Sequence, residues 1–492
     1  MRRAKIMCTL GPATSSPDKI RELVEAGMNV ARLNLSHGSY PDHEEVYHRV
    51  RRASDDCGKA VGVVVDLQGP KIRLGRFAVG SITVRPGDEF TITTRGVAGD
   101  QLVCSTTYAG LPGDVSVGDT ILVDDGRVRL TAVGVDDTDV RCRVEVAGRL
   151  SNNNGINLPG VAVSVPAMSD KDVEDLRWAL HLRADMIALS FVRSADDAAD
   201  VRAVMDEERI WLPVIAKIEK PQAIDHIAEI VTAFDGVMVA RGDLGVEMPL
   251  EDVPFLQKQI IEAARRNAKP AIVATQMLES MISAPRPTRA EASDVANAVL
   301  DGADAVMLSG ETSVGGYPIE TVQTMARIIE STEDHGLARM AAISWQPRTR
   351  GGVIAKAAAE VAERIGAKYL VAFSQSGDTA RRLSRYRSAV PILAFTPVPS
   401  VRSQLAMTWG IETFLGPTVE HTDEMVLQVD KALLKIGRCV EGDQVVIVAG
   451  SPPGIPGSTN ALRIHRMGDA INGAAPAYRS ARLVDEVGSN PG

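Results

Sequence analysis

Residues 236–243, Gly-Val-Met-Val-Ala-Arg-Gly-Asp, are the stretch that decides the fold of this chain. Five small or apolar residues without polar alternation indicate a strand that is covered on both faces, as in a parallel sheet. Seven other runs of this kind follow one another at the spacing of βα units, apart from one long interruption. The eight runs lie at residues 5–9, 29–33, 61–66, 186–190, 214–217, 236–241, 271–275 and 305–309.

The segments between these runs carry helix signals. Ser16 precedes Pro17, the usual order of an N-cap and a first helical residue, Ile20 and Leu23 share one face, and Gly27 ends the segment. Eight parallel strands that alternate with outer helices are the arrangement of a TIM (β/α)8 barrel. We therefore predict an α/β protein whose largest domain is such a barrel.

Two regions depart from the barrel pattern. The long interruption alternates apolar and polar residues between turn signals such as Pro86-Gly87-Asp88, which predicts an antiparallel, barrel-like β domain inserted after the third strand and placed to act as a lid. The last third contains three strand-like runs between helical stretches, which predicts a separate α/β domain. The predicted domains are a discontinuous barrel at 1–69 and 167–340, the insertion at 70–166, the α/β domain at 341–472 and a loose tail at 473–492.

The composition favours a globular protein without a nucleic-acid or membrane partner. The chain has 492 residues and a formal net charge of −9, so it lacks the basic balance of a nucleic-acid binder. No apolar run is long enough to cross a membrane, and no secretory signal precedes the first strand. Five scattered cysteines without metal-binding spacing indicate reduced thiols, so we expect a cytoplasmic protein.

Polar residues gather where the predicted strands end, which is where TIM barrels hold their active sites. Glu219 and Asp243 follow neighbouring strands, so their carboxylates are suited to share one Mg²⁺ or Mn²⁺. Lys217 lies two residues before Glu219 on the same strand face, where its ammonium would neutralise a developing anion. Arg32 and Arg73 add guanidinium groups suited to phosphate. Together these groups predict a site for a phosphate-bearing, multiply anionic substrate.

Several other familiar sites are not supported by the sequence. The stretch from His43 to His48 nearly matches a zinc-protease helix, but its second histidine falls one place late, so we do not expect zinc. Neither a dinucleotide-binding glycine fingerprint nor a P-loop occurs, so neither standard nucleotide-binding fold is predicted.

Six longer motifs extend the predicted strand ends. They are Arg32-Leu33-Asn34-Leu35-Ser36-His37-Gly38, Lys217-Ile218-Glu219-Lys220, Met238-Val239-Ala240-Arg241-Gly242-Asp243-Leu244-Gly245, Ala274-Thr275-Gln276-Met277-Leu278, Pro287-Thr288-Arg289-Ala290-Glu291 and Met307-Leu308-Ser309-Gly310-Glu311-Thr312. With these motifs the chain resembles the pyruvate kinases over nearly its whole length. The resemblance implies a barrel with an inserted β lid and a C-terminal regulatory domain. It also implies glycolytic phosphoryl transfer from phosphoenolpyruvate to ADP, which gives pyruvate and ATP.

The resemblance also implies roles for individual residues. Arg32 is implied to bind substrate phosphate, Lys217 to stabilise the phosphoryl-transfer transition state, and Thr275 to lie where enolpyruvate is protonated. Glu219 and Asp243 are implied to hold Mg²⁺ or Mn²⁺. Contacts with the pyruvate moiety are implied for Gly242, Asp243 and Thr275, and contacts with the nucleotide for Asn34, Ser36, His37 and Arg73. At residues 152–154 three asparagines replace a segment that carries lysine in many members, so that edge of the lid offers the nucleotide no lysine.

The monovalent-cation site of the family is matched by Asn34, Ser36, Asp66 and the Leu67 carbonyl. Many members that need K⁺ carry glutamate where this chain has Lys71, and members that work without K⁺ carry lysine. A tethered ammonium has the charge and about the size of K⁺. We therefore expect that Lys71 substitutes for the ion and that K⁺ is not required; a solvated charge at the lid hinge is the alternative.

The C-terminal domain contains a candidate anion site. Ser374, Ser376, Gly377 and Thr379 lie between a predicted strand and a predicted helix, where hydroxyls and backbone N–H groups can cradle phosphate. A plain helix cap is the alternative. The resemblance favours a site for a phosphorylated allosteric effector, with residues 454–460 closing nearby, and implies a homotetramer.

Two other functions remain open on sequence grounds. Another metal-dependent barrel that handles phosphoenolpyruvate or pyruvate, such as a lyase or mutase, shares the chemistry but lacks the lid and the C-terminal domain. A paralogue that senses metabolites without catalysis is disfavoured because Arg32, Lys217, Glu219, Asp243 and Thr275 are all present.

Overall fold

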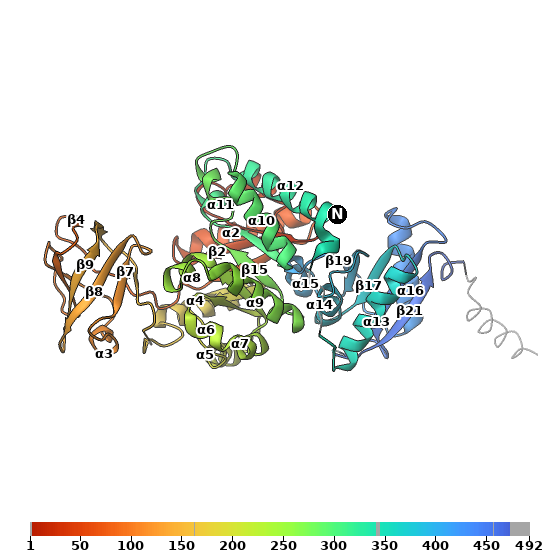
Figure 1. The fold of residues 1–492 in the computed structure, drawn as a ribbon. Coiled ribbons are helices and arrows are strands. Elements are labelled where there is room, and N and C mark those ends of the chain that lie inside the picture. The colour runs from red at the N-terminus through yellow and green to blue at the C-terminus, as the bar shows by residue number, and fades with distance from the viewer. Residues whose placement is uncertain (1, 162, 341–344, 456, 473–492) are drawn as a thin grey trace, which may run out of the picture.

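The computed structural model describes residues 2–161, 163–340, 345–455 and 457–472. Its centre is a closed barrel of eight parallel strands in the order β1-β16-β15-β14-β13-β12-β3-β2, surrounded by helices (Figure 1). The predicted TIM barrel is therefore confirmed. The barrel strands are β1 (Lys5–Thr9), β2 (Val30–Asn34), β3 (Gly62–Asp66), β12 (Met186–Leu189), β13 (Val214–Ile218), β14 (Gly236–Ala240), β15 (Ala271–Ala274) and β16 (Ala305–Leu308).

Burial explains why the barrel strands could be located from sequence to within about one residue at each end. Every residue of β14 and of β3 is buried, because helices cover the outer face and side chains fill the interior. A separate apolar cluster inside the barrel contains Met7, Met238 and Met307. Met407 of the C-terminal domain belongs to the same cluster. The barrel is thus a packed core and leaves only its rim for chemistry.

Helices connect the barrel strands as the sequence predicted. Ser16 caps α1 and accepts a hydrogen bond from the Lys19 N–H, Ile20 and Leu23 are buried, and Gly27 ends the helix at a φ of 128°. The barrel helices are α1 (Pro17–Ala26), α2 (Tyr40–Asp56), α4 (Asp170–His181), α5 (Asp197–Glu208), α6 (Pro221–Asp225), α7 (Ile227–Ala233), α8 (Arg241–Glu247), α9 (Val253–Arg266), α10 (Arg289–Asp301), α11 (Gly310–Ser313) and α12 (Pro318–Gly336).

The inserted domain lies between β3 and α4 and has its own apolar core. Its strands form a six-stranded sheet, β11-β7-β8-β9-β5-β6, and a two-stranded sheet, β10-β4. One pairing differs from the antiparallel expectation, since β5 and β6 run parallel. The elements are β4 (Ser81–Val84), β5 (Glu89–Thr93), β6 (Val103–Ser105), α3 (Leu111–Asp114), β7 (Thr120–Val123), β8 (Val128–Val135), β9 (Asp139–Val146), β10 (Gly148–Ser151) and β11 (Ile156–Asn157).

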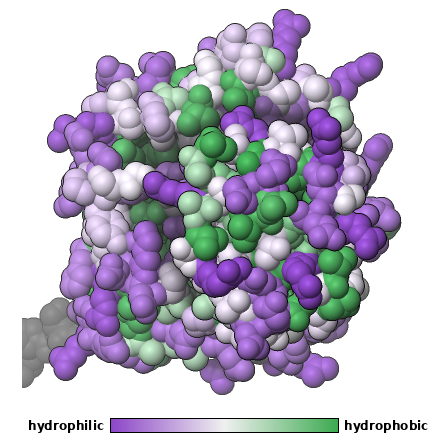
Figure 2. Space-filling model, turned by 90° about the vertical axis from the view of Figure 1, so that its left-hand side faces the viewer, coloured by the Kyte–Doolittle hydropathy of each residue, from purple (hydrophilic) through white to green (hydrophobic). Residues whose placement is uncertain are grey.

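The side of the molecule that carries the inserted domain faces the viewer in Figure 2. Apolar patches there are interrupted by hydrophilic side chains. Val79, Leu102 and Val117 of the inserted domain are exposed. Single exposed apolar residues are normal for a protein surface, so we assign them no function.

The C-terminal domain is a five-stranded sheet in the order β19-β18-β17-β20-β21 with flanking helices. Sequence reasoning predicted three of these strands and missed β19 and β21, in which most residues are exposed or only partly buried, so that neither strand gives a continuous apolar signal. The expected loop at residues 454–460 is also shorter, because β21 begins at Thr459. The elements are α13 (Arg350–Arg364), β17 (Tyr369–Phe373), α14 (Asp378–Ser384), β18 (Ile392–Thr396), α15 (Pro399–Gln404), β19 (Ile411–Leu415), α16 (Thr422–Lys435), β20 (Gln444–Gly450) and β21 (Thr459–Arg466).

Two further expectations concern the whole chain. All five cysteines are free thiols, as expected. Within the described residues no helix is both long and apolar enough to span a bilayer. The expected loose tail at residues 473–492 lies outside the described residues.

Candidate active site

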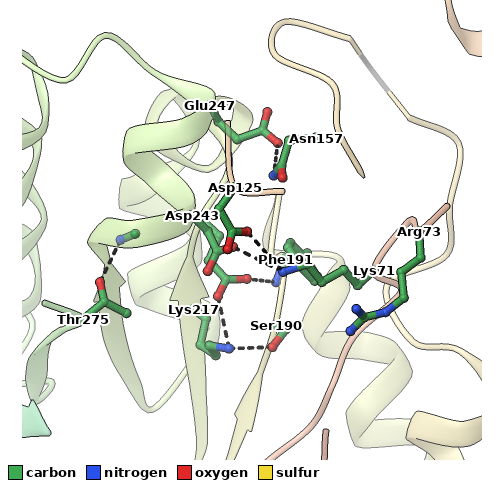
Figure 3. A network of polar contacts seen from close by, with 12 residues as sticks. Lys71, Arg73, Asp125, Asn157, Ser190, Phe191, Lys217, Asp243, Glu247 and Thr275 are labelled. Atoms are coloured by element: carbon green, nitrogen blue, oxygen red, sulfur yellow. Dashed lines mark hydrogen bonds and ion pairs between the residues drawn. The ribbon is translucent and has the colours of Figure 1, made fainter. Parts of the chain in front are cut away.

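Lys217 is the centre of the polar rim at the carboxyl ends of the barrel strands. Its ammonium lies 3.1 Å from Oε1 of Glu219 and 3.3 Å from Oδ1 of Asp66, and it donates a 2.7 Å hydrogen bond to Oγ of Ser190 (Figure 3). Burial lowers the pKa of Lys217, but the charges of Asp66 and Glu219 outweigh it, so the pKa lies above its ordinary value. The side chain is therefore a cation at neutral pH.

Arg32 is held beside Lys217 through their shared partner Asp66. Nε of Arg32 lies 2.6 Å from Oδ2 of Asp66, and Nη1 donates to Oγ1 of Thr9 at 3.0 Å. Burial raises the pKa of Asp66, but Lys217 and Arg32 lower it below its ordinary value. The carboxylate thus stays ionised and positions two cations at the rim.

Glu219 and Asp243 end neighbouring strands, as predicted. Glu219 is 2 % exposed, and its Oε2 accepts a hydrogen bond from the Phe191 N–H at 2.8 Å. Burial raises the pKa of Glu219 and the nearby charge of Asp243 adds to this, although Lys217 opposes it. Two carboxylates that repel one another favour a cation between them.

Glu219 and Asp243 are the two carboxylates that would hold the implied metal ion. Among the described residues no group of three or more His, Cys, Asp or Glu side chains is arranged to hold an ion. Mg²⁺ and Mn²⁺ prefer one or two protein carboxylates, with water and substrate oxygens as their other ligands. Glu219 and Asp243 therefore fit such an ion.

Thr275 and Gly242 follow the neighbouring strands β15 and β14, so they lie on the same side of the rim as Asp243. The Gly242 N–H donates a 2.7 Å hydrogen bond to Oγ1 of Thr275, which itself donates to the Ala274 carbonyl at 2.6 Å. Thr275 has a φ of 71°, which is rare for a β-branched residue and marks a strained backbone. Such strain is concentrated at functional sites, which supports the assignment of Thr275 to this one.

The monovalent-cation residues and Lys71 are not brought into one contact. The ammonium of Lys71 lies 3.9 Å from Oδ1 of Asp125 and 4.0 Å from Oδ1 of Asp243 (Figure 3). The Leu67 carbonyl accepts a 2.8 Å hydrogen bond from Ser190. The Asn34 side chain accepts the Ser36 N–H at 3.3 Å. Lys71 therefore places its positive charge beside Asp243, not beside Asn34 and Ser36.

The residues implied to contact the nucleotide come from two segments: Asn34, Ser36 and His37 lie at the end of β2, and Arg73 lies in the segment that enters the inserted domain. Arg73 points toward the inserted domain, where its Nη1 bonds the Asn153 carbonyl at 3.1 Å. The backbone carbonyl of His37 lies 2.7 Å from Nε2 of His43.

Sequence reasoning missed four residues of the network. Ser190 and Phe191 end the fourth barrel strand, and this position relative to the strand was a signal that could have found them. Glu247 and Asn157 carried no such signal, since their contact joins α8 to β11. Nδ2 of Asn157 donates to Oε1 of Glu247 at 2.9 Å, and the ammonium of Lys220 lies 2.6 Å from the same oxygen (Figure 3).

The candidate effector residues line a cavity of about 620 Å³ in the C-terminal domain. Ser374, Ser376 and Thr379 form part of one wall, and Oγ1 of Thr379 is 2.6 Å from Oγ1 of Thr459 on β21. Gly377 has a φ of 79° and immediately precedes α14.

Comparison with known proteins relates nearly the whole chain to one family. Two family models match: pyruvate kinase, barrel domain, over residues 1–322, and pyruvate kinase, alpha/beta domain, over residues 353–465. A pyruvate kinase of Mycobacterium intracellulare is 59% identical over 468 residues, which cover 95% of this chain and 99% of the relative. One from Corynebacterium efficiens is 58% identical, covering 95% and 98%. The crystal structure of a pyruvate kinase from Cryptosporidium parvum matches with a TM-score of 0.89 at 34% identity, covering 95% of this chain and 96% of that one. Since two family models match the barrel and the C-terminal domain, and relatives of 59% identity cover 95% of it, the chain belongs to the pyruvate kinase family.

Proposed function

We propose that this enzyme transfers the phosphoryl group of phosphoenolpyruvate to ADP through Arg32, Lys217 and Thr275. The observation that carries the proposal is the buried cluster in which Asp66 and Glu219 hold the Lys217 ammonium at the barrel rim, 3.3 and 3.1 Å away. A loose phosphoryl group spreads negative charge over its oxygens, so fixed cations stabilise it more than they stabilise the substrate. Lyases, mutases and non-catalytic sensors do not account for the matches along the whole chain.

Each side chain has a distinct part in this proposal. Arg32 binds the substrate phosphate, and its ion pair with Asp66 limits the directions in which its guanidinium can point. Lys217 supports the charge that develops on the transferred group. Gly242 and Thr275 position the pyruvate moiety, and a proton reaches enolpyruvate on the Thr275 side, where the hydroxyl is ordered by its bonds to Gly242 and Ala274.

Glu219 and Asp243 would hold a Mg²⁺ or Mn²⁺ ion. A divalent cation bound there supplies positive charge to phosphate oxygens. Lys71 adds a tethered charge next to Asp243, and we propose that this charge makes K⁺ unnecessary. Asn34, Ser36, His37 and Arg73 face the ADP side of the opening.

The cavity lined by Ser374, Ser376 and Thr379 is proposed as an allosteric site for a phosphorylated effector. Three hydroxyls and the backbone around Gly377 suit an anionic phosphate, and the cavity of about 620 Å³ leaves room for the rest of a phosphorylated metabolite. Comparing phosphoenolpyruvate saturation curves with and without candidate sugar phosphates and nucleotide monophosphates tests it. An unchanged curve for every compound would contradict allosteric control through this cavity. A homotetramer in the cytoplasm is proposed from the family and from the free cysteines.

A coupled assay for ADP-dependent release of pyruvate tests the catalytic proposal. Pyruvate should appear only when phosphoenolpyruvate, ADP and Mg²⁺ or Mn²⁺ are all present. Release of pyruvate without ADP would indicate a phosphatase or lyase, and no release at all would indicate a non-catalytic protein.

A further inference from the structure

A second concentration of charge lies at the opposite end of the barrel from the candidate active site. A cavity of about 180 Å³ opens there between the barrel and the C-terminal domain. Its lining contains Arg265 and Lys269 of the barrel with Arg381, Arg385 and Arg387 of the C-terminal domain. No role in catalysis or in the candidate effector site accounts for five cations in one place.

The lining does not balance this positive charge. Its one carboxylate, Asp304, lies 2.8 Å from Nη2 of Arg387 and is therefore already paired. Asp235 lies 3.8 Å from Lys269, and it also binds Arg202 at 2.6 Å. The lining thus carries an excess of positive charge in a chain whose formal net charge is −9.

Burial makes this excess unfavourable. Arg265, Arg385 and Arg387 are only 4%, 3% and 7% exposed. Burial, and then the charge of the neighbouring Arg387, lower the pKa of Arg265 to about 10. Burial, and then the charges of Arg381 and Arg202, lower the pKa of Lys269 in spite of Asp235. Like charges in a partly dry cavity repel one another much more strongly than in water.

The side chains in this cavity differ in how many hydrogen bonds and ion pairs they make with other residues. Arg387 bonds Asp304 and the Gly302 carbonyl, and Arg385 bonds the Arg266 carbonyl and stacks on Trp345. These two arginines join the domains. Lys269 has only the distant Asp235, and Arg381 donates one hydrogen bond, 3.0 Å long, to the Ser376 carbonyl. Lys269 and Arg381 therefore keep N–H donors with which they can bind a ligand.

We propose that this cavity binds a small oxyanion such as inorganic phosphate, held by Lys269 from the barrel and Arg381 from the C-terminal domain. An anion would neutralise the repulsion between the two cations and accept charge-assisted hydrogen bonds from both. This cavity is much smaller than the effector cavity, so it suits a single small oxyanion and not a larger phosphorylated molecule.

The position of the site links two functional regions. Lys269 stands just before β15, whose other end delivers Thr275, and Arg381 lies in α14 next to the candidate effector residues. A bound oxyanion would therefore join the barrel to the helix that carries the effector loop. It would hold the two domains in the arrangement seen here.

Thermal unfolding of the full chain tests the proposal, with inorganic phosphate titrated against chloride at constant pH and ionic strength. Phosphate should raise the unfolding temperature of the unchanged chain in a saturable manner, because a ligand of the folded state stabilises it. Lys269→Gln and Arg381→Gln should each raise the half-saturating phosphate concentration tenfold or more. Without phosphate, Lys269→Gln should unfold at no lower a temperature than the unchanged chain, since it removes a repelled charge. Lys435→Gln, which removes an exposed charge from α16, is the matched control and should respond normally.

Two measurements separate this site from the other phosphate-binding positions. Ser376→Ala, in the effector cavity, should keep the stabilisation by phosphate, and a crystal structure in phosphate should show density between Lys269 and Arg381. The proposal is wrong if Lys269→Gln leaves the phosphate response unchanged, if Ser376→Ala removes it, or if density lies only at the active site or the effector cavity. Density between Lys269 and Arg381 without any saturable stabilisation would show an adventitious ion only and would overturn it as well.

Discussion

The ammonium of Lys71 lies 4.0 Å from Oδ1 of Asp243 and connects the segment that enters the inserted domain to a carboxylate of the proposed metal site. The same ammonium lies 3.9 Å from Asp125, in the turn between β7 and β8 of the inserted domain. Its charge is therefore placed where the inserted domain and the barrel rim meet, and its effect on catalysis can be tested directly.

Lys71→Glu should make activity depend on K⁺. The unchanged enzyme should turn over equally well in tetramethylammonium and in K⁺ buffers, because the tethered ammonium already supplies the monovalent charge. The variant reverses that charge beside Asp243, so K⁺ should restore activity that tetramethylammonium does not. Lys71→Met separates loss of the charge from its reversal. Strict dependence of the unchanged enzyme on K⁺ would contradict this prediction.

Lys217→Ala should lower kcat by on the order of 100- to 1,000-fold, the range found when a preorganised charge-stabilising group is removed. Asp66 keeps Arg32 as a partner in this variant, so the barrel should still fold. Coupled-assay kinetics measure the loss, and circular dichroism with thermal unfolding measures the fold. A folded variant with unchanged kcat would remove Lys217 from the mechanism.

Glu247→Ala should weaken the connection between the inserted domain and the barrel. The Glu247 carboxylate accepts a hydrogen bond from Asn157 of β11 and pairs with Lys220, which directly follows Glu219. Loss of such charged hydrogen bonds costs about 1.5–3 kcal/mol, so KM for phosphoenolpyruvate should rise more than kcat falls. Hydrogen exchange in β11 should also increase.

Glu247→Gln is the matched control for this contact. It keeps an acceptor for Asn157 but no charge for Lys220, so its KM should lie between those of the unchanged enzyme and Glu247→Ala. Equal KM values for all three proteins would show that the contact does not position the site.

Lys5 should make stability depend on pH in the alkaline range. The side chain is 5% exposed and donates to the Ile411 carbonyl at 2.7 Å. Burial, followed by the charge of Arg2, lowers its pKa from 10.5 to about 8. The unfolded chain therefore holds this proton more tightly than the folded one, so stability should rise as the pH increases from about 8 to about 10.5. Below pH 8 the lysine is protonated in both states and contributes no slope.

Lys5→Met should remove this component of the pH dependence. Its unfolding temperature at pH 7 should be no lower than that of the unchanged chain, because replacing a buried charge by an apolar side chain of similar length removes a desolvation penalty. Thermal unfolding of both proteins between pH 7 and pH 10 measures the difference. Parallel curves would contradict the lowered pKa of Lys5.

Much of the fold could be predicted because its signals are local. Strands covered on both faces need continuous apolar runs, and helix ends need caps, so β14 and the ends of α1 at Ser16 and Gly27 were found from neighbouring residues alone. The strands β19 and β21 were missed because half-buried strands of a small sheet need no such run.

Some residues of the candidate site could likewise be predicted from the sequence, and others could not. Lys217, Glu219 and Asp243 were identified because each follows a recognisable strand, and barrel closure brings strand ends together. The contact between Glu247 and Asn157 joins α8 to β11, and no short-range pattern in the sequence indicates it. The proposed oxyanion cavity could not be predicted from the sequence either, because Lys269 and Arg381 are far apart in the chain and line one cavity only when the two domains pack.

The order of apolar runs and polar endings in the sequence was sufficient to determine the barrel, the position of the insertion and the identity of the main charged groups at the rim, because hydrophobic burial and helix capping act over a few residues. Tertiary structure alone decided which charges meet. Asp66 shares its carboxylate between Arg32 and Lys217, and the Lys71 ammonium lies beside Asp243 and not between Asn34 and Ser36. Electrostatic energies depend on distance and burial, and both are set only when segments remote in sequence pack against one another.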